Sequence, residues 1–383
     1  MTGSIDVING GDEKPSSTVT TAKQGWSMST GKPFARIALL FVGVGLFSCL
    51  VLYMSADPFR FLPSFYYEDP PVDFLAQTER SPVKMDNELK RVLENATTED
   101  KTVIITTLNE AWAEPESILD VFLESFRVGD GTSKLVKHLV IVCLDQKAYS
   151  RCREIHPHCY ALKTEGADFS GEAYFMTPDY LEMMWRRIDL LTNVLAMGYS
   201  FVFTDADIMW LRDPFKHFYP ATDFQIASDF FTGDPHSLRN SPNGGFNFVR
   251  SNYRTMIFYK FWYYSRTKYP GLHDQDVLNR IKYHPFITEK IGLKIMFLDT
   301  DYFGGFCQPS KDFNKVCTMH ANCCLGLDNK VHDLKIVVQD WKQFQSLTPD
   351  EKSLRSEAKW GVPQHCSMSY HLPEKKIKDE QQH

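Results

Sequence analysis

The chain has 383 residues, 43% of them hydrophobic and 14% aromatic, which is enough for one large or two ordinary folded domains. Its formal net charge of -6 at pH 7 is mildly acidic. This argues against a nucleic acid as partner, because domains that bind nucleic acid concentrate positive charge on one face.

An uncharged run of 18 residues, Ile37–Met54, follows a polar N-terminal segment of 36 residues. Its length is slightly below the roughly 20 residues that a helix typically needs to span a bilayer. A short membrane span is typical of the thinner membranes of the early secretory route. Lys23, Lys32 and Arg36 precede it, while acidic residues follow. The positive-inside rule then predicts a cytosolic tail (1–36), a signal anchor (37–54) and a luminal remainder.

Two other interpretations of this run are less consistent with the sequence. A cleaved signal peptide is disfavoured, because the run begins after 36 residues and no small-x-small site lies between Cys49 and Asp57. A buried core helix is disfavoured because no face of the run is polar. The anchor is therefore the prediction.

Residues 55–100 are rich in proline and acidic residues, which is typical of an extended stem. Asn95-Ala96-Thr97 fits the acceptor pattern for N-glycosylation, and we predict modification at Asn95. Eight cysteines follow the apolar run, and an even number in an oxidising compartment favours disulfides whose pairing the sequence leaves open. The alternative is a zinc site made by Cys317, His320, Cys323 and Cys324, although adjacent cysteines are poor tetrahedral ligands together.

From Lys101 onward, strand-like and helix-like segments alternate, and no internal repeat is present. This pattern predicts an α/β fold with a mostly parallel sheet flanked by helices. The expected strands are 102–107, 138–144, 201–204 and 295–298; the expected helices are 115–127, 146–155, 177–197, 253–264 and 277–283.

Two carboxylates, Asp205 and Asp207, come directly after the strand at 201–204. The helix before this strand has Thr177 as its cap, Pro178 in its first turn and Gly198 at its end. Ligands collect beyond the carboxyl ends of strands in open α/β sheets, and paired carboxylates there can hold a divalent cation that in turn holds a diphosphate. The pattern therefore favours an enzyme acting on nucleotide-sugars over a solvated acidic loop.

Two further Asp-x-Asp triplets compete with this one. Asp299 and Asp301 also follow an apolar strand and are the second candidate for the metal site. Asp274 and Asp276 lie in a first helical turn, where carboxylates are often simple dipole partners.

Several polar residues are candidates for the donor side of the site. Thr107 and Asn109 follow the first strand, where a nucleoside would lie, and no glycine-rich phosphate loop follows them, which argues against a dehydrogenase. Asn243 and Gly244 precede a strand and permit close backbone approach to a ligand, or they form an ordinary turn. Either Arg186 or Arg187 could reach phosphates or sugar, or both could lie on a solvated helix face.

Five segments in order resemble glycosyltransferase family 77, the nucleotide-diphospho-sugar transferase family, closest to its plant branch: TVIITTLNEAW (102–112), FTDADIMWLRDP (203–214), NGGFNF (243–248), Asp274-Gln275 and MHANCC (319–324). The resemblance covers about residues 101–341. It implies a GT-A domain, taken as 101–373 with a tail at 374–383, in a type II Golgi membrane protein. It also implies a UDP-sugar donor, retention of anomeric configuration, and a cell-wall polysaccharide or glycoprotein acceptor.

The same resemblance implies roles for individual residues. Asp205 and Asp207 match the metal-binding pair, and His320 matches the histidine that completes the coordination of Mn²⁺ or Mg²⁺, with His365 and His371 as rivals. Asp274 and Gln275 match the segment that lines the donor sugar, so they are the expected catalytic residues. The loops at 230–242 and 301–314 are expected to set specificity.

Two other functions are compatible with these motifs. A nucleotide-sugar hydrolase would use the same metal with water as the acceptor. A catalytically silent Golgi scaffold would keep the fold without the activity. Loss of one of the two metal-binding carboxylates would favour that function, but Asp205 and Asp207 are both present.

Overall fold

The computed structural model describes residues 74, 86–162, 177–354 and 357–369, which all belong to one compact unit, Tyr67–His383. The expected cytosolic tail, the anchor at 37–54, most of the stem and the tail at 374–383 lie outside the described residues. None of the helices in the described part of the chain has the length and apolarity needed to cross a bilayer.

A seven-stranded sheet forms the centre of the described part, in the order β3-β2-β1-β4-β7-β6-β8. Only β7 runs antiparallel to its neighbours, so the predicted mostly parallel α/β sheet is confirmed. A smaller sheet has the order β5-β10-β9. The strands are β1 Thr102–Leu108, β2 Leu139–Cys143, β3 Cys159–Ala161, β4 Ser200–Thr204, β5 Ile208–Trp210, β6 Phe224–Phe230, β7 Ser241–Val249, β8 Ile295–Phe297, β9 Phe303–Gly305 and β10 Thr318–His320.

Helices cover both faces of the large sheet, because successive strand side chains point to opposite sides. Ile104 packs in one buried cluster, while Val103 and Ile105 pack in the other. The first cluster contains α5 (Ile118–Val128), α6 (Gln146–Ile155) and α10 (Leu327–Gln345), and the second contains α3 (Asn87–Ala96), α7 (Pro178–Ala196), α8 (Tyr253–Ser265) and α9 (Asp274–Ile281). Shorter helical segments are α4 (Glu110–Ala113), η2 (Ser133–His138), η3 (Pro214–His217), η4 (Phe286–Lys290), α11 (Pro349–Leu354) and α12 (His365–Ser369).

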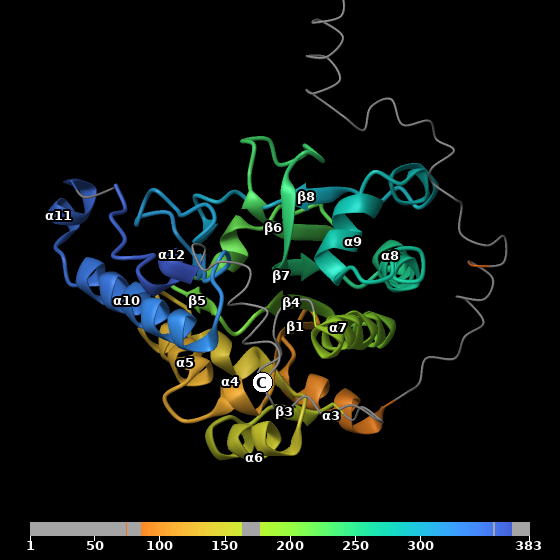
Figure 1. Ribbon diagram of the computed structural model, residues 1–383, viewed down its shortest axis with the longest axis horizontal. Helices are drawn as coiled ribbons and strands as arrows, with labels where there is room; N and C mark the ends of the chain where they lie inside the picture. The colour runs from red at the N-terminus through yellow and green to blue at the C-terminus, as the bar shows by residue number, and fades with distance from the viewer. Residues whose placement is uncertain (1–73, 75–85, 163–176, 355–356, 370–383) are drawn as a thin grey trace, which may run out of the picture. The chain divides into compact units, whose positions relative to one another are not determined.

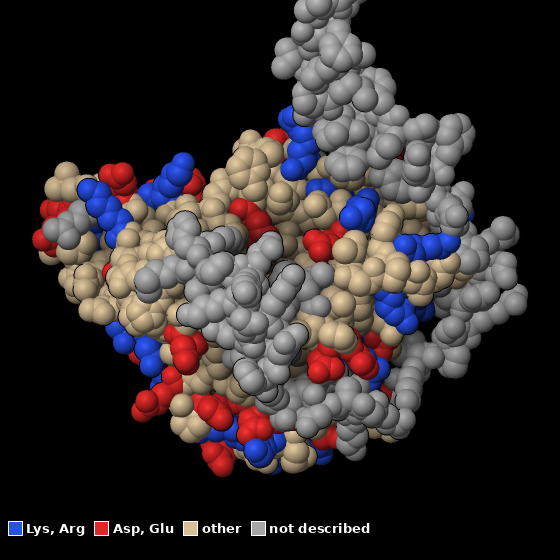
Figure 2. Space-filling view, viewed as in Figure 1, with Lys and Arg blue, Asp and Glu red and all other residues tan. Residues whose placement is uncertain are grey.

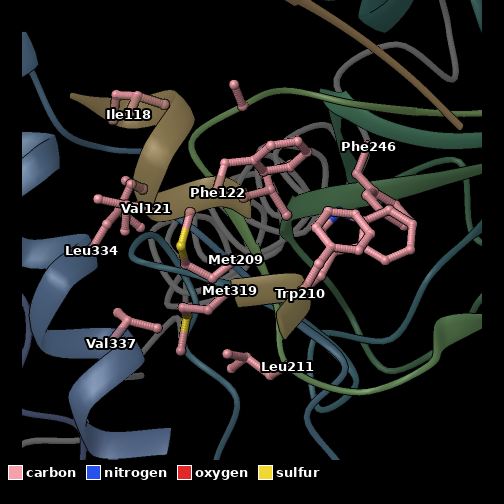
Figure 3. Packing of buried hydrophobic residues seen from close by; sticks show 14 of the residues in the cluster. Ile118, Val121, Phe122, Met209, Trp210, Leu211, Phe246, Met319, Leu334 and Val337 are labelled. Carbon is pink, nitrogen blue, oxygen red and sulfur yellow. The ribbon is translucent and has the colours of Figure 1, made fainter. Parts of the chain in front are cut away.

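The first cluster joins the small sheet to the large one. Figure 3 shows side chains of α5 and α10 meeting Met209 and Trp210 of β5 and Met319 of β10. Met209 and Met319 are paired residues of neighbouring antiparallel strands, and both are fully buried. This apolar support fixes β5 and β10, which carry the residues of the candidate site at their ends.

The predicted helices are largely confirmed. Thr177 caps α7, Pro178 begins it, and Gly198 follows its end with a φ of +85°, a conformation that favours glycine. The helix expected at 115–127 instead begins at Ile118, after Glu116 with a φ of +66°. The helix expected at 277–283 begins earlier, at Asp274, because His273 caps it by accepting from the Gln275 N–H.

The expected stem boundary at Asp100 is placed too late, because α3 belongs to the folded unit. Asp86 caps α3, and its residues at helical spacing are buried against the sheet: Leu89, Val92, Leu93 and Ala96. Asn95 lies exposed in the last turn of this helix, and its glycosylation stays a prediction.

Among the described residues, three disulfides join Cys152 to Cys159, Cys307 to Cys323, and Cys324 to Cys366. The alternative zinc site is therefore wrong, since Cys323 and Cys324 are each paired elsewhere. Cys143 and Cys317 are free and buried, and burial raises the pKa of each thiol to about 12, which keeps both protonated.

Figure 2 shows acidic and basic side chains interspersed among the described residues of one face.

Candidate metal and donor site

The strand β4 delivers Asp205 and Asp207 to the carboxyl edge of the large sheet. The Asp205 N–H donates to the Gly245 carbonyl of β7 at 2.7 Å, and the Asp207 carbonyl accepts from the Ala321 N–H at 3.0 Å. Antiparallel pairing of β5 with β10 places His320 opposite Ile208. As a result, ligand atoms of Asp205, Asp207 and His320 lie within 4.8 Å of one another, the only such group of three in the described part of the chain.

Asp207 is buried between the nitrogen atoms of His320 and Lys330. Its Oδ1 lies 3.2 Å from His320 Nε2, and its Oδ2 lies 2.6 Å from Nζ of Lys330 on α10. Burial alone would raise the pKa of Asp207, but the charges of Lys330 and His320 outweigh it and hold the pKa well below its ordinary value. Burial opposes a charge on His320 as well, yet the neighbouring Asp207 raises its pKa.

Arg187 links the metal carboxylates to the expected sugar side. Its Nη1 lies 3.0 Å from Asp205 Oδ1, its Nη2 lies 2.5 Å from Asp274 Oδ2, and its guanidinium covers the Phe203 ring at 4.7 Å. Burial would raise the pKa of Asp274, but Arg187 and His273 lower it to about 2, so the carboxylate is ionised.

Of the two arginines, Arg187 lies at the candidate metal carboxylates, while the Arg186 guanidinium lies 3.9 Å from Asp189 on its own helix. Donor binding by Arg187 stays a prediction. Asp274 is 1% exposed and meets the site through Arg187.

The remaining sugar-side residues form one polar cluster. The Gln275 Oε1 accepts from the Gly244 N–H at 2.8 Å, and the Asn243 Oδ1 accepts from the Gly245 N–H at 3.0 Å. The amide nitrogens of Gln275 and Asn243 both donate to Asp229 at the end of β6. The structure thus brings Asn243, Gly244 and Gln275 together, with Asn243 and Gly244 inside β7 rather than ahead of a strand or in a turn. Donor binding by these residues stays a prediction.

Thr107 and Asn109 lie at the same edge of the sheet. The parallel register pairs Ile105 of β1 with Phe203 of β4, so Thr107 reaches the level of Asp205 two residues later. The Asn109 side chain accepts from the Trp112 N–H at 3.3 Å and thereby caps α4. Trp112 in turn lies 5.4 Å beneath the Lys330 ammonium. Donor binding by Thr107 and Asn109 stays a prediction.

The competing acidic pairs have ordinary partners. Asp299 accepts from the Asp301 N–H at 2.9 Å, and the Asp301 carboxylate pairs with Lys315 at 3.1 Å. Asp276 pairs with His273 in the first turn of α9. Among the rival histidines, His365 stacks on His332 at 3.5 Å, and His371 lies outside the described residues.

Sequence reasoning missed Lys330, Asp229 and Asn322. Asp229 carries the same signal as Asp205, an acidic residue where a buried strand ends. Lys330 lies in the first turns of an otherwise amphipathic helix, and no local pattern distinguishes it from other surface lysines.

The residues present fit a divalent cation. Two carboxylates and one imidazole nitrogen converge, which is a donor set suited to Mn²⁺ or Mg²⁺. Gly245 supplies the room, because a Cβ on it would lie 2.6 Å from Asp205 Oδ2 and 2.7 Å from His320 Cε1. A glycine at position 245 therefore lets the β7 backbone lie directly against the side chains of Asp205 and His320.

Replacing Gly245 by Ala is expected to weaken Mn²⁺ binding about tenfold or more, since the added methyl group must push Asp205 or His320 out of place. Calorimetric titration of the full chain with MnCl₂ in the presence of UDP measures the change. Gly244→Ala is the matched control, because its Cβ would meet atoms at ordinary distances of 3.6 to 3.8 Å. Equal affinities for the two variants would contradict the proposed crowding.

Residues 134–334 match the family described as nucleotide-diphospho-sugar transferase, which is more than half of the chain. The chain belongs to the nucleotide-diphospho-sugar transferase family. The resemblance seen in its motifs is thereby confirmed. The chain is 54% identical over 281 residues to the Arabidopsis thaliana protein At4g15970, covering 73% of each chain.

A more distant sequence relative of this chain carries a functional name, and one solved structure gives a weak structural alignment. The Arabidopsis thaliana UDP-D-xylose:L-fucose alpha-1,3-D-xylosyltransferase 3 is 22% identical, covering 55% of this chain and 60% of that protein. A solved structure of the apo-form glycosyltransferase GlyE of Streptococcus pneumoniae aligns with a TM-score of 0.37 at 10% identity, covering 69% of this chain and 66% of that one.

Proposed function

We propose that this protein is a metal-dependent retaining glycosyltransferase with a GT-A-type domain. It transfers a sugar from a UDP-sugar to a glycan or glycoprotein acceptor of the cell wall. The observation that carries the proposal is the convergence of Asp205, Asp207 and His320 within 4.8 Å, in a chain of the nucleotide-diphospho-sugar transferase family. The UDP-sugar donor named for the distant xylosyltransferase supports the choice of donor class.

Asp205, Asp207 and His320 would hold the cation, which when bound supplies positive charge for the leaving diphosphate. The imidazole ligand favours Mn²⁺ over Mg²⁺. Lys330 neutralises Asp207 at 2.6 Å in the structure. With a cation held by Asp205, Asp207 and His320, the nearby Lys330 ammonium would supply a second positive charge for the diphosphate.

The donor sugar would lie against Asn243, Gly244 and Gln275. Gln275 is held at both ends of its amide, by the Gly244 N–H and by Asp229, so its position is set before a ligand arrives. In a retaining transfer the acceptor hydroxyl attacks the face that UDP leaves, and no carboxylate base is required. The Arg187–Asp274 pair keeps the sugar side at a fixed distance from Asp205.

Acceptor choice is assigned to the loops at 230–242 and 301–314. The two loops touch, because the Phe231 N–H donates to Gln308 Oε1 at 2.6 Å. We place the protein in the Golgi membrane as a single-pass type II protein with a luminal catalytic domain. Three disulfides support an oxidising compartment for that domain.

The test is UDP release by the full chain, in detergent, from a panel of UDP-sugars with Mn²⁺, with Mg²⁺ and with a chelator. We expect release from one donor, lost with the chelator and greater with Mn²⁺. Product analysis separates the alternatives: free sugar with no acceptor growth indicates a hydrolase. Absence of any metal-dependent UDP binding would contradict the proposal and favour a scaffold.

A further inference from the structure

One carboxylate, Asp229, accepts hydrogen bonds from three side-chain amides that belong to three separate parts of the chain. Its Oδ1 accepts from Asn243 Nδ2 of β7 at 2.8 Å and from Asn322 Nδ2, just after β10, at 2.7 Å. Its Oδ2 accepts from Gln275 Nε2 of α9 at 2.9 Å. The close arrangement of β6, β7 and α9 that permits this is visible in Figure 1.

The opposite ends of the three amides are also occupied. The oxygens of Asn243, Gln275 and Asn322 accept from the backbone N–H groups of Gly245, Gly244 and Cys307, at 3.0, 2.8 and 3.1 Å respectively. A backbone N–H can only donate, so these contacts fix which end of each amide is oxygen. The NH₂ groups must then face Asp229, and only an acceptor with two oxygens satisfies all three.

Asp229 thereby connects the two sides of the site. Gln275 and Asn243 belong to the sugar side, while Asn322 follows the metal-side His320 by two residues. The Cys307–Cys323 disulfide closes the segment that contains His320 and Asn322, and the Asn322 amide binds its Cys307 end. Asp229 itself is absent from the group of metal-ligating side chains.

We propose that Asp229 is a positioning residue for the donor sugar. It holds the amides of Gln275 and Asn243 in the orientation that recognises the sugar, and it does so without touching the cation ligands. The inference rests on the proposed function, since it concerns the sugar part of the same nucleotide-sugar. Loss of Asp229 should therefore affect binding of a UDP-sugar and spare binding of UDP.

Asp229→Asn tests the proposal, because it keeps the shape and replaces one acceptor oxygen by a donor that opposes at least one of the three amides. Calorimetry with Mn²⁺ measures two dissociation constants, one for UDP and one for the UDP-sugar from which the wild type releases UDP. We expect the UDP-sugar Kd to rise about 10- to 100-fold and the UDP Kd to change less than about twofold. The double variant with Gln275→Ala should bind the UDP-sugar less weakly than the two single variants predict additively, because part of the Asp229 effect acts through Gln275 and the rest through Asn243.

Asp234→Asn is the matched control, since the exposed Asp234 carboxylate accepts from the nearby His236 N–H at 2.9 Å in its own loop, and the variant should leave both donor affinities unchanged. Asp229→Glu keeps both acceptor oxygens and should restore part of the UDP-sugar affinity. Equal weakening of UDP and UDP-sugar, or no change in either, would overturn the positioning role alone. A wild type that binds UDP but no UDP-sugar would overturn the proposed function together with it.

Discussion

Replacing Asp207 by Asn is expected to lower metal-dependent turnover about 1000-fold or more and to abolish Mn²⁺ binding in the micromolar range. The substitution removes a buried negative charge that faces His320 at 3.2 Å and Lys330 at 2.6 Å. Without it, two positive or partly positive groups remain where a cation has to bind. A loss of about 4 kcal/mol of charge stabilisation in the transition state corresponds to that factor in rate.

Asp301→Asn is the matched control for this variant. It changes the equivalent carboxylate of the competing Asp-x-Asp pair, which contacts Lys315 and is partly exposed. It should leave UDP release measured without acceptor within about twofold of the wild type, because its loop is assigned to the acceptor and partly exposed ion pairs contribute little. UDP release and Mn²⁺ titration are measured for both variants, with circular dichroism to verify folding. A folded Asp207→Asn protein with wild-type turnover would remove Asp207 from the metal site.

Replacing Arg187 by Met is expected to lower the free energy of unfolding by about 3 to 5 kcal/mol. Arg187 is 5% exposed and neutralises Asp205 and Asp274, so its removal leaves carboxylates buried without a counter-charge. Arg186→Met is the control on the neighbouring position, where the partly exposed guanidinium is 3.9 Å from Asp189. It should cost less than about 1 kcal/mol. Denaturant unfolding of both variants at pH 7 measures the difference.

The deficit of Arg187→Met should shrink as the pH falls from 7 to 5. In the wild type, Arg187 helps to hold the folded pKa of Asp274 at about 2, below its unfolded value, so this stabilisation is present above the unfolded pKa. In the variant, burial dominates and raises the folded pKa above the unfolded one. Folding of the variant then favours the protonated Asp274 carboxyl. The free energy of unfolding of the variant therefore falls as the pH rises from the unfolded pKa of Asp274 through its raised folded pKa. A deficit that stays constant between pH 5 and pH 7 would show that lost packing, rather than uncompensated charge, causes it.

Most of the local structure could be predicted from the sequence. The run Phe201–Thr204 before Asp205 indicated a strand that ends in carboxylates, and β4 is that strand. Thr177, Pro178 and Gly198 marked both ends of α7 correctly. Capping residues and apolar periodicity act within a few residues, so they determine elements regardless of what packs against them.

The partners within the candidate site were less accessible to prediction. Lys330 comes 123 residues after Asp207, and the two meet because α10 packs on the cluster that contains β5. Asp229 meets Asn322 across 93 residues through the adjacency of β6 and β9. No spacing in the sequence encodes these distances, because they depend on how the sheets and helices stack.

The sequence by itself therefore determined the alternating α/β pattern, the position of Asp205 and Asp207 after a buried strand, and the family motifs around them. The tertiary structure decided that His320 completes the group, that Arg187 rather than Arg186 faces inward, and which cysteines pair. The physical reason is the range of the interactions. Helix capping, helical hydrogen bonds and side-chain periodicity are local, whereas strand pairing and the buried charges of the site depend on contacts between elements distant in the chain.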